Sequence, residues 1–205
     1  MGQSKDDFVS PIIARNQMVS TLVAFSRDAI SSDNLNGLFQ AVANTAVLEM
    51  GLPDCVVYQV SEDGAKLIQV AAHGAKSPEG VEVNEPLVLS IGQGVTGRAA
   101  LMCRSLMIDD TSSFSDHIPD IGSGRSEIAV PIIHREMVIG VIDCEHPTVG
   151  YFNEEHLLTL EAIACIASSK ISALSKIFET STADRDGDAT KVLELNEFRN
   201  QPSRA

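Results

Sequence analysis

Hydrophobic positions change their spacing along the chain, and these changes predict where strands and helices lie. Residues 126–146 contain two runs rich in Val, Ile and Ala, separated by a polar break at His134-Arg135-Glu136. Short, β-branched runs bounded by a turn predict the two strands of an antiparallel hairpin. Both faces of the first run are apolar, which places it near the middle of a sheet covered on both sides. One face carries Ile128, Val130 and Ile132, and the other carries Ala129 and Ile133.

Acidic residues interrupt this apolar pattern at Glu127, Asp143 and Glu145. A buried carboxylate costs free energy unless a partner compensates for it, so these side chains either face solvent or line a site. Asp143 and Glu145 are two positions apart and therefore share a face of the strand. The alternative to a ligand site is that the acids cap strand ends and bind Arg98 or Arg125.

The turn of the hairpin decides whether Glu127 shares that face. A two-residue turn at Arg135-Glu136 would pair His134 with Met137 and leave Glu127 on the face opposite to Asp143. Neither Arg nor Glu favours the positive φ that such a turn requires. A longer or bulged loop is therefore expected, and an odd number of loop residues brings Glu127 alongside Asp143.

Helical spacing appears on both sides of the hairpin. Ser10-Pro11 predicts the start of a first helix, with Ser as the cap and Pro in the first turn. Residues 32–34 cap a second helix, which Gly51 and Pro53 end. Further along, the pattern predicts three strands and a short helix, at Cys55–Val60, Lys66–Ala72, Leu87–Ser90 and Val95–Cys103.

The last predicted helix begins at Asn153 and carries apolar residues at heptad spacing. These residues are Leu160, Ala164, Ala167, Ile171, Leu174 and Phe178. One side of this helix packs on the sheet, but the part from Lys170 extends past the expected sheet edge and predicts a parallel homodimer. Residues 1–9 are predicted to be a flexible N-terminus, residues 10–179 the domain, and residues 180–205 a polar linker or tail that leads to an output domain outside this chain.

Composition limits the classes of function. The chain of 205 residues is 44% hydrophobic, enough for one domain with a sizeable core. Its net charge of −13 argues against nucleic-acid binding. The cysteines, Cys55, Cys103, Cys144 and Cys165, lack metal-ligand spacing, which predicts reduced thiols and a cytoplasmic protein. The sequence pattern predicts no stretch that approaches the roughly 18 apolar residues of a membrane span, so no membrane partner is expected.

Residues 92–97 match the spacing of the dinucleotide-binding fingerprint, G-x-G-x-x-G. That fingerprint requires a parallel strand–helix–strand context, and here an irregular polar loop and a hairpin follow the helix instead. A glycine turn that leads into the short helix is the preferred interpretation. The N–H groups at the start of such a helix could hold an anion.

The hairpin and its flanks together resemble the GAF domain, the small-molecule-sensing module of many bacterial signalling proteins. The resemblance covers residues 35–178 and rests on Ile91–Gly97, Ser126–Pro131, Ile139–Asp143 and Phe152 before a long helix. It implies an α+β fold with a central antiparallel sheet of about five or six strands. It also implies that the N- and C-terminal helices lie together on one face, and that the loop at residues 109–125 caps a ligand pocket.

Residues 114–127 are similar to a loop of the free methionine-R-sulfoxide reductases, an enzymatic GAF family. Where that family carries cysteines, this chain has Thr96 and Asp120. The reaction needs one thiolate to attack the sulfoxide sulfur and a second thiol to resolve the sulfenic acid. No catalytic residue is therefore predicted. The carboxylates that hold the substrate amine in that family do match, at Glu127, Asp143 and Glu145.

The sequence thus predicts a non-catalytic sensor domain that binds an unidentified small molecule between the sheet and the loop at residues 109–125. The candidate ligand-binding residues are Glu127, Asp143, Glu145, Thr96, His117 and Asp120. A reductase with an altered site and a ligandless dimerisation module are the alternatives. A metal site around His117 with nearby aspartates ranks behind them. The cofactor is unknown, because signatures for haem, a bilin or a cyclic nucleotide are absent from the sequence.

Overall fold

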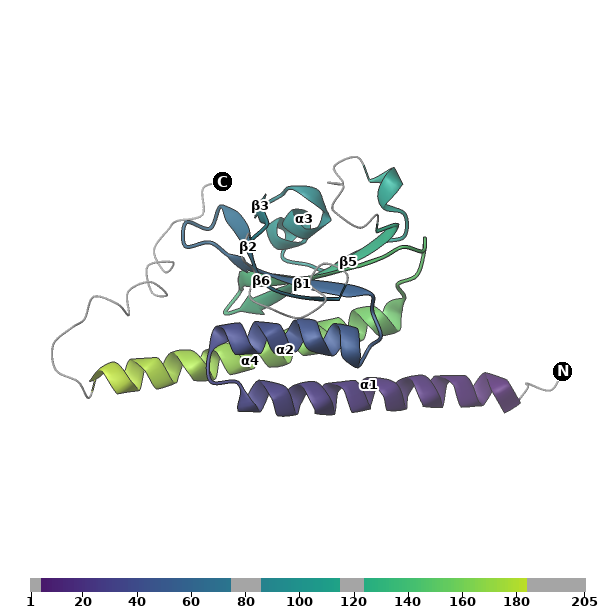
Figure 1. The fold of residues 1–205 in the computed structure, drawn as a ribbon, viewed down its shortest axis with the longest axis horizontal. Coiled ribbons are helices and arrows are strands. Elements are labelled where there is room, and N and C mark those ends of the chain that lie inside the picture. Colours follow the sequence, from purple (N-terminus) through teal and green to yellow (C-terminus); the bar gives the residue numbers. More distant parts are fainter. Residues whose placement is uncertain (1–4, 75–85, 115–123, 184–205) are drawn as a thin grey trace.

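The chain folds around an antiparallel sheet with helices on both faces (Figure 1). The computed structural model describes residues 5–74, 86–114 and 124–183. The strands are β1 (Asp54–Val60), β2 (Lys66–Gly74), β3 (Val88–Ser90), β4 (Leu106–Ile108), β5 (Ser126–His134) and β6 (Met137–His146). The helices are α1 (Lys5–Ser31), α2 (Leu35–Leu48), α3 (Gly94–Met102) and α4 (Glu154–Ala183), with a 3-10 turn at Thr111–Ser113.

The six described strands form one sheet in the order β3-β2-β1-β6-β5-β4. Helices α1, α2 and α4 cover one face, and α3 lies on the other (Figure 1). Every described strand pair is antiparallel, so the glycines at residues 92–97 do not belong to a dinucleotide-binding fold. The α+β architecture expected from the sequence is confirmed, with both terminal helices on one face.

The helix boundaries differ from the prediction at the N-terminus. Helix α1 begins at Lys5 rather than at Ser10, so residues 5–9 of the predicted flexible segment are helical. Pro11 lies inside the helix, where it lacks the N–H that would bond the carbonyl four residues earlier. At α2 the prediction holds, because the Asn34 side chain accepts a hydrogen bond from the Gly37 N–H at 2.9 Å. Helix α4 continues to Ala183, four residues beyond the predicted end of the domain.

The β5–β6 hairpin combines a tight turn with a bulge. Arg135 and Glu136 have φ values of 47° and 68°, and His134 pairs with Met137, so the turn has two residues. The expectation of a longer loop on the ground of these φ values was wrong. The register then shifts between Ile132 and Ile133, because one extra residue stands in β6. From that bulge onward Glu127 lies opposite Glu145, so Glu127 shares a face with Asp143 and Glu145, a point that the sequence left open.

Two apolar clusters hold the sheet between its helical layers. The larger cluster lies on the three-helix face and includes Phe25, Leu38, Phe39, Ile128, Ile142, Leu160 and Ile163. The smaller cluster lies on the α3 face and consists mostly of Val and Ala. The alternation expected for β5 is observed up to Ile132, because Ile128, Val130 and Ile132 join the larger cluster and Ala129 joins the smaller. Ile133, expected on the same covered face as Ala129, is instead 38% exposed.

Helix α4 is an internal helix over most of its length. The heptad residues Leu160, Ala164, Ala167, Ile171 and Leu174 are each at most 6% exposed within this single chain. They were predicted to form a seam between two subunits, but they are already buried against the same molecule's sheet and helices. The side chain of Phe178 lies outside the described residues. Leu174 is therefore a buried position of the folded chain and not an open dimer contact.

The same helix meets the length and composition of a membrane span. Residues 154–175 have a mean hydropathy of 1.5, the one such segment in the part of the chain that the structure describes. The expectation that no stretch approaches this limit was wrong. Packing inside the domain explains the apolarity, because the helix buries one side on the sheet and on α1.

Replacing Leu160 by Ala should lower the free energy of unfolding by about 2–5 kcal/mol, because the fully buried side chain leaves a cavity. Leu158 lies on the same helix and is 48% exposed, so Leu158→Ala should change stability by less than about 0.5 kcal/mol. Urea denaturation of both variants measures the difference. Equal losses would contradict the orientation of α4.

Candidate functional site: a buried carboxylate triad

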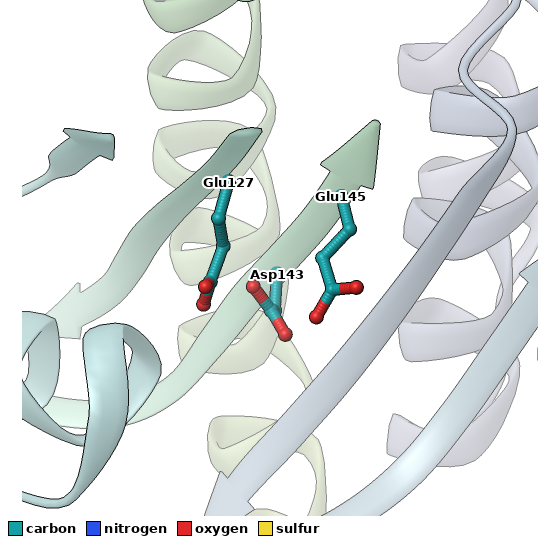
Figure 2. Close-up of side chains that lie close together, drawn as sticks. All are labelled: Glu127, Asp143 and Glu145. Carbon is teal, nitrogen blue, oxygen red and sulfur yellow. The ribbon is translucent and has the colours of Figure 1, made fainter. Parts of the chain in front are cut away.

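Three acidic side chains meet on the α3 face of the sheet, and we call them the carboxylate triad. Glu127 comes from β5, and Asp143 and Glu145 come from β6 (Figure 2). One carboxylate oxygen from each lies within 4.8 Å of the others. The three residues are only 4%, 4% and 8% exposed. The sequence left open whether these acids face solvent or line a site. Because all three are buried, they do not face solvent.

The strand register explains why the triad forms. Glu127 pairs with Glu145 across the two strands, and Ala129 pairs with Asp143, so Glu127 and Asp143 are diagonal neighbours. Without the extra residue at the bulge, Glu127 would lie opposite Cys144, whose side chain belongs to the three-helix cluster. A shift of one residue exchanges the two faces of a strand. The bulge is therefore what brings the third acid to the site.

Thr96 approaches the triad from α3. Its hydroxyl lies 3.3 Å from Glu127 Oε1 and donates a hydrogen bond to it, and the residue is 3% exposed. The glycines on either side of it make this approach possible. Gly92 and Gly94 have φ values of 89° and 65°, and a Cβ on Gly97 would lie 2.6 Å from the Ser90 carbonyl oxygen. These glycines allow a close turn that packs α3 against the sheet.

Asp54 is a fourth buried acid at this edge, and the sequence analysis missed it. It is 6% exposed, and its Oδ1 accepts a hydrogen bond from the Glu145 backbone N–H at 3.1 Å. Its side chain thereby replaces a backbone carbonyl where β1 begins and fixes the strand that carries Glu145. An acid between Pro53 and a strongly apolar strand was the signal that could have identified it.

The loop before β5 closes over Glu145 at Gly124. A Cβ on Gly124 would lie 2.4 Å from Glu145 Oε2, so only glycine fits there without a shift. Thr111 holds this backbone by donating its hydroxyl to the Gly124 carbonyl oxygen at 2.7 Å. Asp110 pairs with Arg125 at 3.6 Å. The pKa of Asp110 is lowered because the Ser112 hydroxyl and N–H donate to its carboxylate.

Two of the predicted ligand residues, His117 and Asp120, lie outside the described residues. Both arginines that were proposed as alternative partners make contacts in the structure. Arg125 pairs with Asp110, and the Arg98 guanidinium lies over the Phe114 ring at 4.9 Å from its centroid. Thr96, Glu127, Asp143 and Glu145 are the predicted residues that the structure brings together.

The thiols lie away from the triad or on the protein surface. Cys55 and Cys144 are buried in the three-helix cluster, on the opposite side of the sheet. A hydrogen bond with Cys55 and burial raise the pKa of Cys144 well above its usual value, which disfavours the thiolate. Cys103 and Cys165 are exposed.

The sequence matches the family described as GAF domain over residues 32–172. The chain belongs to the GAF domain family. The free methionine-R-sulfoxide reductase of Escherichia coli is 31% identical over 67 residues, which are 33% of this chain and 41% of that protein. Protein ZMO0507 of Zymomonas mobilis is 38% identical over 65 residues, 31% of this chain and 40% of that protein. The matched segments thus cover about two fifths of the length of these curated relatives.

Solved GAF-type structures share the fold. The free methionine-R-sulfoxide reductase of Neisseria meningitidis, in complex with its substrate, superposes with a TM-score of 0.69 at 21% identity, covering 78% of this chain and 91% of that one. The GAF domain of an Acinetobacter phosphoenolpyruvate-protein phosphotransferase gives 0.67 at 20% identity, covering 84% and 99%. The solved structures that share the fold of this GAF domain therefore include a free methionine-R-sulfoxide reductase as well as the GAF domain of a phosphotransferase.

Three buried carboxylates in this arrangement suit a cation. At an effective dielectric constant of about 20, two like charges this close repel by about 3–4 kcal/mol before neighbouring groups compensate. A metal ion that prefers oxygen ligands, or an organic ammonium group, would relieve that repulsion. Glu127, Asp143 and Glu145 are the residues that would hold either one.

Replacing Gly124 by Ala should displace Glu145 and lower the free energy of unfolding by about 1–3 kcal/mol, because the new Cβ overlaps that side chain. Gly37→Ala is the matched control, since its Cβ would have no neighbour nearer than 3.5 Å. Urea denaturation gives the stability, and the amide NMR signal of Glu145 reports the displacement. A Gly124→Ala protein that is as stable as the control, with that signal unmoved, would contradict the closure.

Proposed function

We propose that this GAF domain is a non-catalytic sensor of a small organic molecule that carries an ammonium group, and that the carboxylate triad binds that group. The observation that carries the proposal is the convergence of three buried carboxylates within 4.8 Å. An ammonium group has three N–H donors and no hydrogen-bond acceptor, so it can donate to three converging carboxylate oxygens.

The relatives support this ligand class. The reductases that resemble this chain are named for free methionine-R-sulfoxide, an amino acid derivative with an α-ammonium group. The triad stands at the positions that the resemblance assigns to holding such an amine. A free amino acid or another small primary amine is therefore the proposed ligand class.

The proposal of a sensor rather than a reductase rests on the missing thiols. Thr96 contributes a hydroxyl beside Glu127, where the sequence resemblance places a cysteine in the enzymes. Among the described residues, the buried thiols Cys55 and Cys144 lie across the sheet from the triad. A hydroxyl cannot form the sulfenic acid that the reaction requires. A reductase that uses other thiols is the alternative.

Transmission would run from the triad strand into α4. Strand β6 carries two of the three acids and leads directly to this helix, which extends past the sheet (Figure 1). We also propose a cytoplasmic homodimer that passes its signal to an output domain outside this chain. Because the α4 seam is internal, the dimer contact moves to the outer face of α1, where Val19, Val23 and Ile30 are 60%, 53% and 76% exposed.

A screen of amino acids and small primary amines by thermal shift tests the ligand. A compound at a hundred times its dissociation constant should stabilise the wild type by roughly 2.7 kcal/mol. Asp143→Asn should reduce that ligand-dependent shift strongly, because it removes one of the charges that hold the ammonium group. Asp63→Asn, on an exposed turn, should leave it unchanged. If no amine stabilises the wild type at millimolar concentration, the ligandless dimerisation module becomes the better account.

A coupled assay with thioredoxin and free methionine-R-sulfoxide tests the absence of catalysis. We expect no turnover above background. Turnover that disappears in Cys103→Ser, and not in the matched Cys165→Ser variant, would show that an exposed thiol has taken over the reaction and that the protein is an enzyme.

A further inference from the structure

The first turn of α4 is capped by a histidine. The Asn153 side chain accepts a hydrogen bond from the His156 N–H at 3.1 Å, and His156 Nδ1 accepts one from the Asn153 N–H at 3.3 Å. This reciprocal pair is a capping box, in which the returning residue is usually Glu or Gln. Here a group that titrates near neutral pH takes that place.

The hydrogen bond defines the protonation state of the ring. Nδ1 can accept from Asn153 only while it carries no proton, so the histidine is neutral with its proton on Nε2. Protonation would remove the acceptor. It would also place a positive charge at the N-terminus of a helix, where the dipole disfavours cations.

An aromatic stack connects this cap to the triad strand. Tyr151 stacks on His156 with ring centroids 5.3 Å apart, and on His146 at 3.4 Å. His146 is the last residue of β6 and directly follows Glu145. Phe152 meets the His156 ring edge-on at 5.8 Å. The stack thus spans the short connection between β6 and α4.

We propose that His156 makes this connection sensitive to protons, so that mild acidification opens the first turn of α4 and loosens the helix from the triad strand. The device needs only the capping box and the stack, and does not depend on what the triad binds. The position of α4, the last helix of the domain, would then depend on pH.

The groups around His156 act on its pKa in both directions, and the net shift is downward. Burial lowers the pKa of His156, the neighbouring Glu155 carboxylate opposes that shift, and the charge of His146 adds to it. Since the folded-state pKa lies below the ordinary value of 6.5, the neutral ring stabilises the fold above about that pH. This stabilisation is lost as the pH falls from there through the folded-state pKa.

The test compares wild type with His156→Gln, which keeps an acceptor for the Asn153 N–H but does not titrate. Urea denaturation between about pH 8 and about pH 5 should show a steeper loss of stability in the wild type. Each unit by which the pKa of His156 is lowered weakens the folding equilibrium tenfold once the ring is protonated. His73→Gln is the control, because His73 Nδ1 lies 2.7 Å from Asn44 Oδ1 and must donate there, which protonation does not prevent.

A second measurement needs no variant. In the wild type, the NMR signal of the Asn153 amide should shift with the same midpoint as the His156 ring protons. The proposal is overturned if the NMR signal of the Asn153 amide does not titrate with the His156 ring. It is also overturned if His156→Gln loses stability on acidification as steeply as the wild type and the His73→Gln control do.

Discussion

The insertion of one residue into β6, at the bulge beside Ile132 and Ile133, determines which side chains meet on the α3 face. The two-residue turn at Arg135-Glu136 alone would place Glu127 opposite Cys144, on the three-helix face of the sheet. There a carboxylate would be buried in an apolar layer at a cost of several kcal/mol. The bulge removes that cost and, by the same shift, completes the carboxylate triad. Fold stability and the presence of the site therefore depend on one register.

The two faces of the sheet have different roles: one supplies the hydrophobic core, and the other carries the carboxylate triad. The three-helix face buries large side chains such as Phe25, Phe39 and Leu160, which supply most of the hydrophobic stabilisation. The α3 face is lined by smaller residues, including Ala99 and Ala129, beside the charged triad. A stable layer on one face allows the other to carry buried charges that would be too costly in a core without such support.

Features set by local sequence were predictable, and features set by distant contacts were not. The hairpin, the Asn34 cap and the glycine turn before Thr96 follow from neighbouring residues, and the structure has all three. The positive φ values at Arg135 and Glu136 were judged unfavourable from local preference, but the sheet on either side imposes them. Asp54 was missed because its partner, the Glu145 N–H, lies 91 residues away. The heptad residues of α4 were assigned to a dimer because periodicity alone cannot tell which molecule covers an apolar stripe.

The central claim is that the triad on the α3 face binds a cationic small molecule. Mapping of backbone amide NMR shifts during titration with a small primary amine tests it most directly. The account predicts that the largest shifts, saturating with one dissociation constant, fall on Thr96, Gly124, Glu127, Asp143 and Glu145. Residues of the three-helix cluster such as Leu38 and Ile163 should stay unmoved. Saturable shifts concentrated on the helical face, or a triad that no amine perturbs, would contradict it.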